Sequence, residues 1–162
     1  GNCGGETASS ADVWLAGYPY LVSVKDPWCS YSASSTWKRT IPRSEWNNYL
    51  ESKGVKPGTE VTIYSTNALA GNRITRRTVQ GKTLWSEEMR LRFGLRSAYF
   101  TITSAGDSIV FTGRGYGHGV GLCQDGAKHM AEKKMSFTRI IGFYYPGTII
   151  TDVKKARMPV RP

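Results

Sequence analysis

Two stretches of this chain carry polar residues suited to helix ends, and the first also has apolar residues at helical spacing. The segment 44–52 places Trp46, Tyr49 and Leu50 three to four positions apart, and the segment 86–94 runs from acidic to basic residues before a glycine. Acidic side chains favour the positive N-terminal end of a helix, and glycine favours its termination. We therefore predict a short helix in each segment.

Runs of β-branched and aromatic residues with a period of two predict the strands. The predicted strands are 20–24, 59–65, 74–79, 99–103, 108–112 and 148–153. Turn residues at 71–72 indicate that the second and third strands pair in antiparallel fashion. The sequence Ser-Ala-Gly-Asp at 104–107 indicates a hairpin between the fourth and fifth.

Two more helices are predicted near the C-terminal end. The segment 120–133 gathers its apolar residues on one face, and Ser136 is suited to cap a helix that ends at Pro146. Residues 1–35 are rich in loop-forming residues and predict an irregular N-terminal layer. The sum is a single α+β domain over 1–162, with a mixed or antiparallel sheet and several short helices.

Composition supports a folded domain and indicates the kind of partner. The chain has 162 residues, of which 40% are hydrophobic and 21% charged, so it can bury a core. It has 22 Lys and Arg against 12 Asp and Glu, a net charge of +10. This favours polyanions, whether nucleic acid, acidic lipid or an anionic cell-wall polymer. No run approaches the roughly 18 apolar residues of a transmembrane helix, so we expect no such segment.

Glycine occupies every second position from 113 to 121. In an extended chain this would leave one side without side chains, where a flat ligand such as a sugar ring, or another backbone, can approach. The other side would display Arg114, Tyr116 and His118, which suit recognition of a polyol or an anionic sugar. The alternative is a glycine-rich corner that lets a helix pack closely on a strand. The nucleotide-binding glycine patterns are absent.

The two histidines have no spacing typical of a metal site. His118 precedes the predicted helix 120–133, whose positive end would disfavour an imidazolium, so we predict a neutral, hydrogen-bonding ring. His129 is interpreted as an ordinary helix residue.

The three cysteines contain no Cys-x-x-Cys pair. Cys3 and Cys29 lie in loop sequence and are candidates for a disulfide in an oxidising compartment. Two alternatives stay open: these thiolates form half of a metal site completed by upstream residues, or they are two buried thiols. Cys123 falls in a helical pattern and should point into the core.

One acid/base carboxylate would suffice for a glycosidic cleavage that ends with attack by an internal hydroxyl. The glutamates before the glycine run are explained by helix starts, a strand start or solvent exposure, apart from Glu6. For Glu6 we favour a loop-capping role, so the catalytic residue is unknown.

Several blocks of sequence carry a family resemblance. They are 2–7 (NCGGET), 12–14, 19–21, 26–29, 115–127 (GYGHGVGLCQDGA), 130–131 and 144–148 (YYPGT). Together they resemble the SpoIID/LytB family. The resemblance implies an extracytoplasmic, cell-wall-associated protein. Members include lytic transglycosylases that cut peptidoglycan strands lacking stem peptides, and enhancers of N-acetylmuramoyl-L-alanine amidases.

The resemblance also implies site residues. The glycan groove should be lined by Arg114, Tyr116, His118 and Gln124, and the acid/base glutamate of lytic members should lie upstream of residue 1. Some members bind zinc near the Cys-Gly-Gly loop with an upstream histidine. With Cys3 and Cys29 alone we expect no cofactor, and zinc stays the alternative. The family more often has Ser at the position of Cys123.

The expected partners are peptidoglycan glycan strands and, for the enhancer alternative, a cell-wall amidase. A nucleic-acid binder is the rival from another class, but no nucleic-acid-binding motif supports it.

Overall fold

A computed structural model describes residues 1–14, 16–30, 32–33, 35–58 and 76–152. The helices are α1 (Ser10–Trp14), α2 (Arg43–Ser52), α3 (Ser86–Phe93), α4 (Gln124–Glu132) and α5 (Phe137–Tyr144). The strands are β1 (Thr36–Pro42), β2 (Arg76–Val79), β3 (Lys82–Trp85), β4 (Phe100–Ala105) and β5 (Ser108–Arg114). The predicted α+β class is confirmed.

The main sheet has three antiparallel strands in the order β1-β5-β4. Its central strand is therefore β5, which comes after the other two in the sequence. β5 alternates as its sequence predicts, with Ile109, Phe111 and Gly113 buried. It forms the predicted hairpin with β4. β2 and β3 make a separate two-stranded hairpin.

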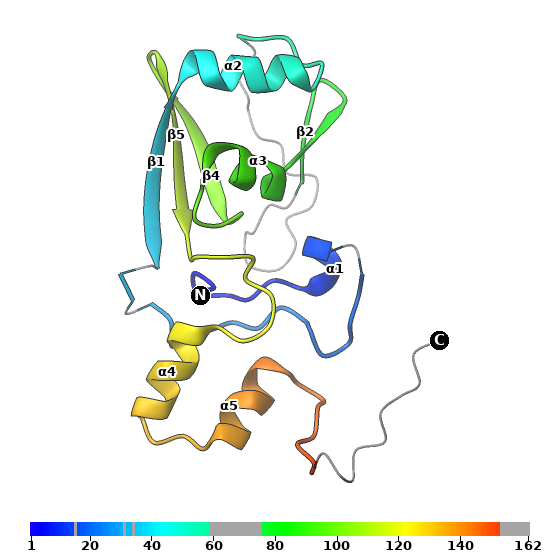
Figure 1. Cartoon of the computed structure of the whole chain (residues 1–162), viewed down its shortest axis with the longest axis vertical. Coiled ribbons are helices and arrows are strands. Elements are labelled where there is room, and N and C mark those ends of the chain that lie inside the picture. Colours follow the sequence, from blue (N-terminus) through cyan, green and yellow to red (C-terminus); the bar gives the residue numbers. More distant parts are fainter. Residues whose placement is uncertain (15, 31, 34, 59–75, 153–162) are drawn as a thin grey trace.

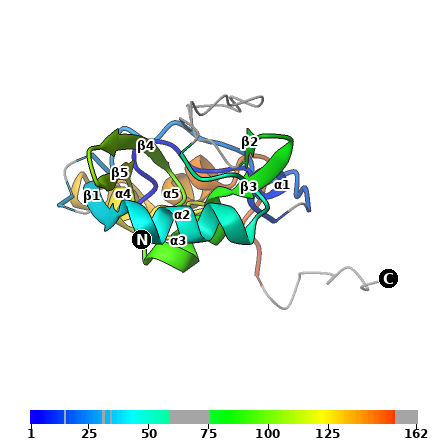
Figure 2. The same ribbon diagram turned by 90° about the horizontal axis from the view of Figure 1, so that it is seen from above.

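Helices α2 and α3 lie on the same side of the main sheet (Figure 2). They pack against it to form the first of two hydrophobic cores. Aromatic rings dominate it: the Phe111 ring lies 5.4 Å from that of Phe93 and 6.0 Å from that of Trp46. Phe111, on the central strand, is fully buried. Both helices were predicted, α2 from the helical spacing of its apolar residues and α3 from its acidic start, basic end and glycine stop.

Helices α4 and α5 form the opposite end of the molecule, and the N-terminal loop layer lies between them and the sheet (Figure 1). The second core joins Met130, Ile140 and Tyr144 to the three cysteines. Ser136 caps α5 as predicted, since its hydroxyl accepts a hydrogen bond of 3.3 Å from the Arg139 N–H.

Some sequence-based elements were wrong. Residues 20–24 and 148–152 form no strand. The helix predicted from 120 begins at Gln124, because glycines with left-handed backbone precede it. β1, β3 and α1 were not predicted, and in β1 two successive exposed basic residues hide the alternation. The predicted strand 59–65, the start of 74–79 and residue 153 lie outside the described residues.

Within the described part of the chain, no helix is both long enough and apolar enough to cross a membrane.

Candidate functional site: a glycine loop beside a thiol cluster

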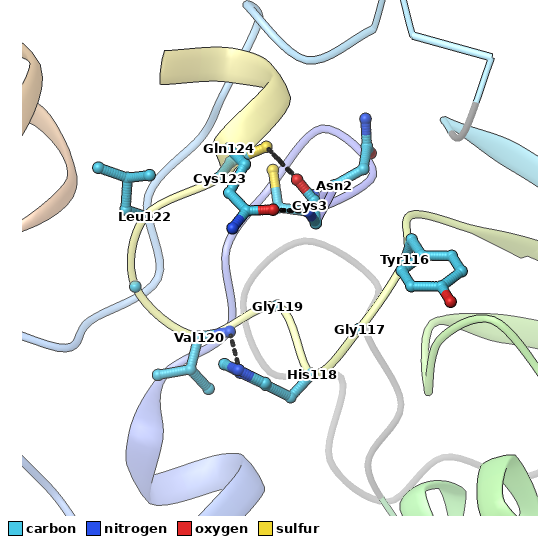
Figure 3. A pocket seen from close by; sticks show the side chains of 12 residues that line it. Asn2, Cys3, Tyr116, Gly117, His118, Gly119, Val120, Leu122, Cys123 and Gln124 are labelled. Carbon is cyan, nitrogen blue, oxygen red and sulfur yellow. Dashed lines mark hydrogen bonds between the residues drawn. The ribbon is translucent and has the colours of Figure 1, made fainter. Parts of the chain in front are cut away.

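The glycine run forms a winding loop between β5 and α4 (Figure 3). Gly115, Gly117, Gly119 and Gly121 have φ values of 77°, 98°, 79° and 73°. This left-handed backbone is costly for any residue with a Cβ, which explains glycine at each position. The expectation of an extended strip with one continuous bare face was therefore wrong.

Backbone hydrogen bonds attach the loop to three other segments. The Tyr116 N–H donates to the Asn2 carbonyl at 2.7 Å, and the Gly117 N–H donates to the Arg96 carbonyl at 2.8 Å. The Gly119 carbonyl accepts from Ala8 at 2.8 Å. The loop is thus held in one conformation by main-chain partners.

Close packing favours glycine at three of these positions. A Cβ on Gly113 would overlap the Trp37 ring, and one on Gly115 would lie 2.5 Å from the Asn2 carbonyl oxygen. On Gly121 it would lie 3.2 Å from the Tyr145 ring. Gly117 differs, because no atom lies within 4 Å of the position of its Cβ. These neighbours are a ring of the adjacent strand, a loop backbone and Tyr145, rather than a helix packed on a strand, and the loop is open at Gly117.

A pocket of about 300 Å³ lies along the loop. Its lining consists of residues 1–3 and 116–124. Tyr116, His118 and Gln124 belong to it with exposed side chains, so the structure brings three of the four predicted glycan-binding residues together. Arg114 is exposed at the end of β5 and does not contribute to this lining.

His118 is oriented by a hydrogen bond within the loop. Its Nδ1 accepts from the Val120 N–H at 3.0 Å (Figure 3), so the ring in this arrangement is neutral and carries its proton on Nε2. The helix-based reason for a neutral ring was wrong, because α4 begins only at Gln124. The ring centroid lies 5.4 Å from that of Trp14, which is 48% exposed. Sequence reasoning missed Trp14 as a neighbour of the site.

Two tyrosines of the Tyr-Tyr-Pro-Gly block form hydrogen bonds with residues at the site. The Tyr145 hydroxyl accepts from the Leu122 N–H at 3.2 Å. The Tyr144 hydroxyl donates to Asp26 Oδ2 at 2.8 Å. Within the block 144–148, Tyr145 thus holds the glycine loop in place and Tyr144 holds Asp26 in the second core.

Next to the pocket lies a cluster of four buried side chains, which we call the thiol cluster: Cys3, Asp26, Cys29 and Cys123. Their ligand atoms all lie within 4.8 Å of one another. The Cys3 and Cys29 sulfurs are 3.4 Å apart, and no disulfide joins the three thiols in this structure. Cys123 points into the core as predicted and thereby reaches the other two.

Hydrogen bonds within the cluster shift the pKa values of its thiols in opposite directions. Bonds from Cys123 and Cys3 lower the pKa of Cys29 to about 4, because they stabilise its thiolate. The corresponding bonds raise the pKa of Cys3, which remains a thiol and donates to Asp26 Oδ2 at 3.2 Å. Burial raises the pKa of Asp26, opposed by the hydrogen bond from Tyr144.

Two other residues considered from sequence have structural partners. Glu6 Oε1 accepts from the Ser23 hydroxyl at 2.8 Å, as a loop-capping side chain would. His129 lies in α4, where its Nδ1 is 3.0 Å from the Trp28 carbonyl. Asp26, which sequence reasoning missed, could have been noticed because it begins the Asp-Pro-Trp-Cys segment that contains Cys29.

Comparison with known proteins gives three informative relatives. Stage II sporulation protein D of Bacillus subtilis (strain 168) is 36% identical over 149 residues, which are 91% of this chain and 43% of that protein. An uncharacterised protein of Brachyspira hyodysenteriae is 31% identical over 99% of this chain and 44% of its own length. The amidase enhancer of B. subtilis is 28% identical over 92% of this chain and 28% of its own length.

No protein-family model matches the chain. The chain spans less than half the length of these three relatives. The resemblance inferred from the sequence blocks is confirmed along most of the chain.

Proposed function

We propose that this chain binds glycan strands of peptidoglycan, as part of an extracytoplasmic, peptidoglycan-processing protein of the SpoIID/LytB family. Its homology to stage II sporulation protein D and to an amidase enhancer supports the proposal. The observation that carries the proposal is the pocket along the glycine loop. It combines exposed main chain with exposed aromatic and polar side chains.

The lining offers what a sugar ring requires. Tyr116 is 57% exposed and presents an apolar ring face as well as a hydroxyl. His118 uses Nδ1 inside the loop, so its Nε2–H is the group that can donate to a sugar hydroxyl. Gln124 adds an amide nitrogen that can donate, while its Oε1 accepts from the Gly1 amino group. The open position at Gly117 lets a ring approach the main chain.

The proposal includes lytic transglycosylase cleavage of denuded strands when a glutamate from upstream of residue 1 completes the site. None of the side chains that line the pocket is a carboxylate. That glutamate would protonate the glycosidic oxygen and then take a proton from an internal hydroxyl of the sugar. In this scheme His118 and Gln124 bind and orient the strand and transfer no proton.

Binding of denuded glycan strands to this chain tests the proposal. We expect His118→Ala to weaken binding about 10-fold, the effect of losing one hydrogen bond and one ring contact. His129→Ala is the matched control, because His129 lies on α4 outside the pocket, and it should bind as the parent does. Equal binding by both variants and the parent would refute the site.

The relative named amidase enhancer supports an alternative: a non-catalytic module that enhances an N-acetylmuramoyl-L-alanine amidase. The two functions differ in their products. Digestion of denuded strands by the longer protein that includes the upstream segment should yield anhydro-muramyl ends. If none form, and added amidase instead cleaves faster in its presence, the enhancer function is correct.

A further inference from the structure

The thiol cluster places soft ligand atoms at the spacing of a tetrahedral metal site. With zinc–sulfur bonds of about 2.3 Å, thiolates on one tetrahedral ion lie about 3.8 Å apart. Cys3 and Cys29 are 3.4 Å apart, and all four ligand atoms of the cluster fall within 4.8 Å of one another. All four residues are buried, so the ligands are already gathered without the ion.

We propose that Cys3, Cys29, Cys123 and Asp26 bind one Zn²⁺ ion through three sulfurs and one carboxylate oxygen. This goes beyond the proposed glycan binding and does not depend on it. Every ligand comes from this chain, and none is a histidine. On binding, the thiol protons are released to solvent, and the ion remains divalent.

Backbone N–H groups around the cluster are arranged for thiolates. Cys123 Sγ accepts from the Cys3 N–H at 3.3 Å and from the Gly126 N–H at 3.4 Å. Cys29 Sγ accepts from the Gly5 N–H at 3.1 Å. Such donors stabilise negative charge on sulfur. A neutral thiol has far less need of N–H donors.

The carboxylate has outer partners of the kind that orient a metal ligand. Tyr144 donates to Asp26 Oδ2 at 2.8 Å, and the Trp28 N–H donates to Oδ1 at 2.9 Å. Gly126 makes room for this arrangement, because a Cβ there would lie 2.5 Å from Asp26 Oδ2. These contacts fix the carboxylate beside the sulfurs.

Two pockets border the cluster. Cys3 and Cys123 line the pocket of the glycine loop. Cys29 lines a second pocket of about 380 Å³, together with Asp125 and His129. An ion in either pocket would therefore lie next to residues of the cluster.

Cobalt titration of the reduced protein under anaerobic conditions tests the proposal. We expect about one Co²⁺ per chain, with thiolate-to-cobalt charge-transfer bands and ligand-field bands of a tetrahedral site, both abolished by Zn²⁺. Cys123→Ser and Asp26→Asn should each lower Zn²⁺ affinity more than about 100-fold, beyond the range for outer partners. Tyr144→Phe, which removes only an outer partner, should lower it about 10-fold.

Asp125→Asn is the matched control, because Asp125 is a nearby carboxylate outside the cluster. It should leave affinity unchanged. Should a ligand variant fail to fold, the parent supplies a second measurement: a chelator should release about one zinc per chain and lower the melting temperature, and added Zn²⁺ should restore it.

Three results would overturn the site. The first is a reduced parent that gives no thiolate-to-cobalt bands. The second is a Cys123→Ser variant that binds Zn²⁺ as tightly as the parent. The third is a Cys3–Cys29 disulfide, found by peptide mass spectrometry of protein isolated without reductant, that leaves no zinc bound.

Discussion

The core beneath the main sheet and the core around the thiol cluster are built from different side chains. The first contains Trp46, Phe93, Phe100 and Phe111, brought together by two helices and a hairpin. The second has fewer large apolar residues and includes the three cysteines. Its polar groups come mainly from loops that are distant in sequence.

The difference shows where each region obtains its stability. Burial of apolar area stabilises the first core without requiring any one partner. In the second, buried Asp26 depends on its hydrogen bonds, because an unmatched polar group in a low-dielectric interior is costly. The second core should therefore tolerate less chemical change, while the first should lose most from lost volume.

The largest expected effect is in the first core. Phe111→Ala should lower the free energy of unfolding by about 3–5 kcal/mol, because it removes a fully buried ring from the central strand. Phe137→Ala is the control: this ring is 68% exposed, and its loss should cost less than about 0.5 kcal/mol. Urea denaturation measures both. Equal effects would contradict the assignment of Phe111 to the core.

A single added methyl group should distinguish the second core. Gly126→Ala should destabilise the protein by about 1–3 kcal/mol, since the new Cβ would overlap the Tyr144 hydroxyl and crowd Asp26. The control is Gly142→Ala in α5, where no atom lies within 4 Å of the Cβ position. There alanine should stabilise the helix by about 0.5–1 kcal/mol. A Gly126 variant as stable as the parent would show that this core accommodates added volume.

The regular elements could be read from the sequence because their signals are local. Helical spacing predicted α2, and an acidic start with a basic end and a glycine stop predicted α3. A turn between two alternating runs predicted the β4–β5 hairpin. β1 was missed because Arg39 is exposed although it lies on the same face as buried Trp37 and Ile41, which interrupts the alternation. Its pairing with β5 is a long-range contact that no local pattern reports.

The candidate site was only partly predictable. The glycine run identified the loop, but not its left-handed backbone, because alternating glycine fits an extended strand equally well. The proximity of Trp14 to His118, and of Asp26 to three cysteines, depends on how loops pack against one another. Sequence spacing contains no information on that packing.

An intermediate effect is expected from one hydroxyl group in the second core. Tyr144→Phe should lower the free energy of unfolding by about 1–2 kcal/mol, because buried Asp26 loses a hydrogen-bond donor at 2.8 Å. Tyr116→Phe is the control, since Tyr116 is 57% exposed and its loss of a hydroxyl should cost less than about 0.5 kcal/mol. If the two variants unfold at the same urea concentration, the Tyr144 hydroxyl is not important for stability.

The smallest effect on stability is expected where the effect on metal binding is largest. Cys123 precedes α4, and its sulfur accepts from the Gly126 N–H at 3.4 Å, the position of an N-cap side chain. A serine hydroxyl accepts such a hydrogen bond at least as well, so Cys123→Ser should change the stability of the metal-free protein by less than about 1 kcal/mol. Added Zn²⁺ should raise the melting temperature of the parent but not of this variant, because only the parent retains three sulfurs. A variant that is strongly destabilised without metal would mean that Cys123 is needed for packing.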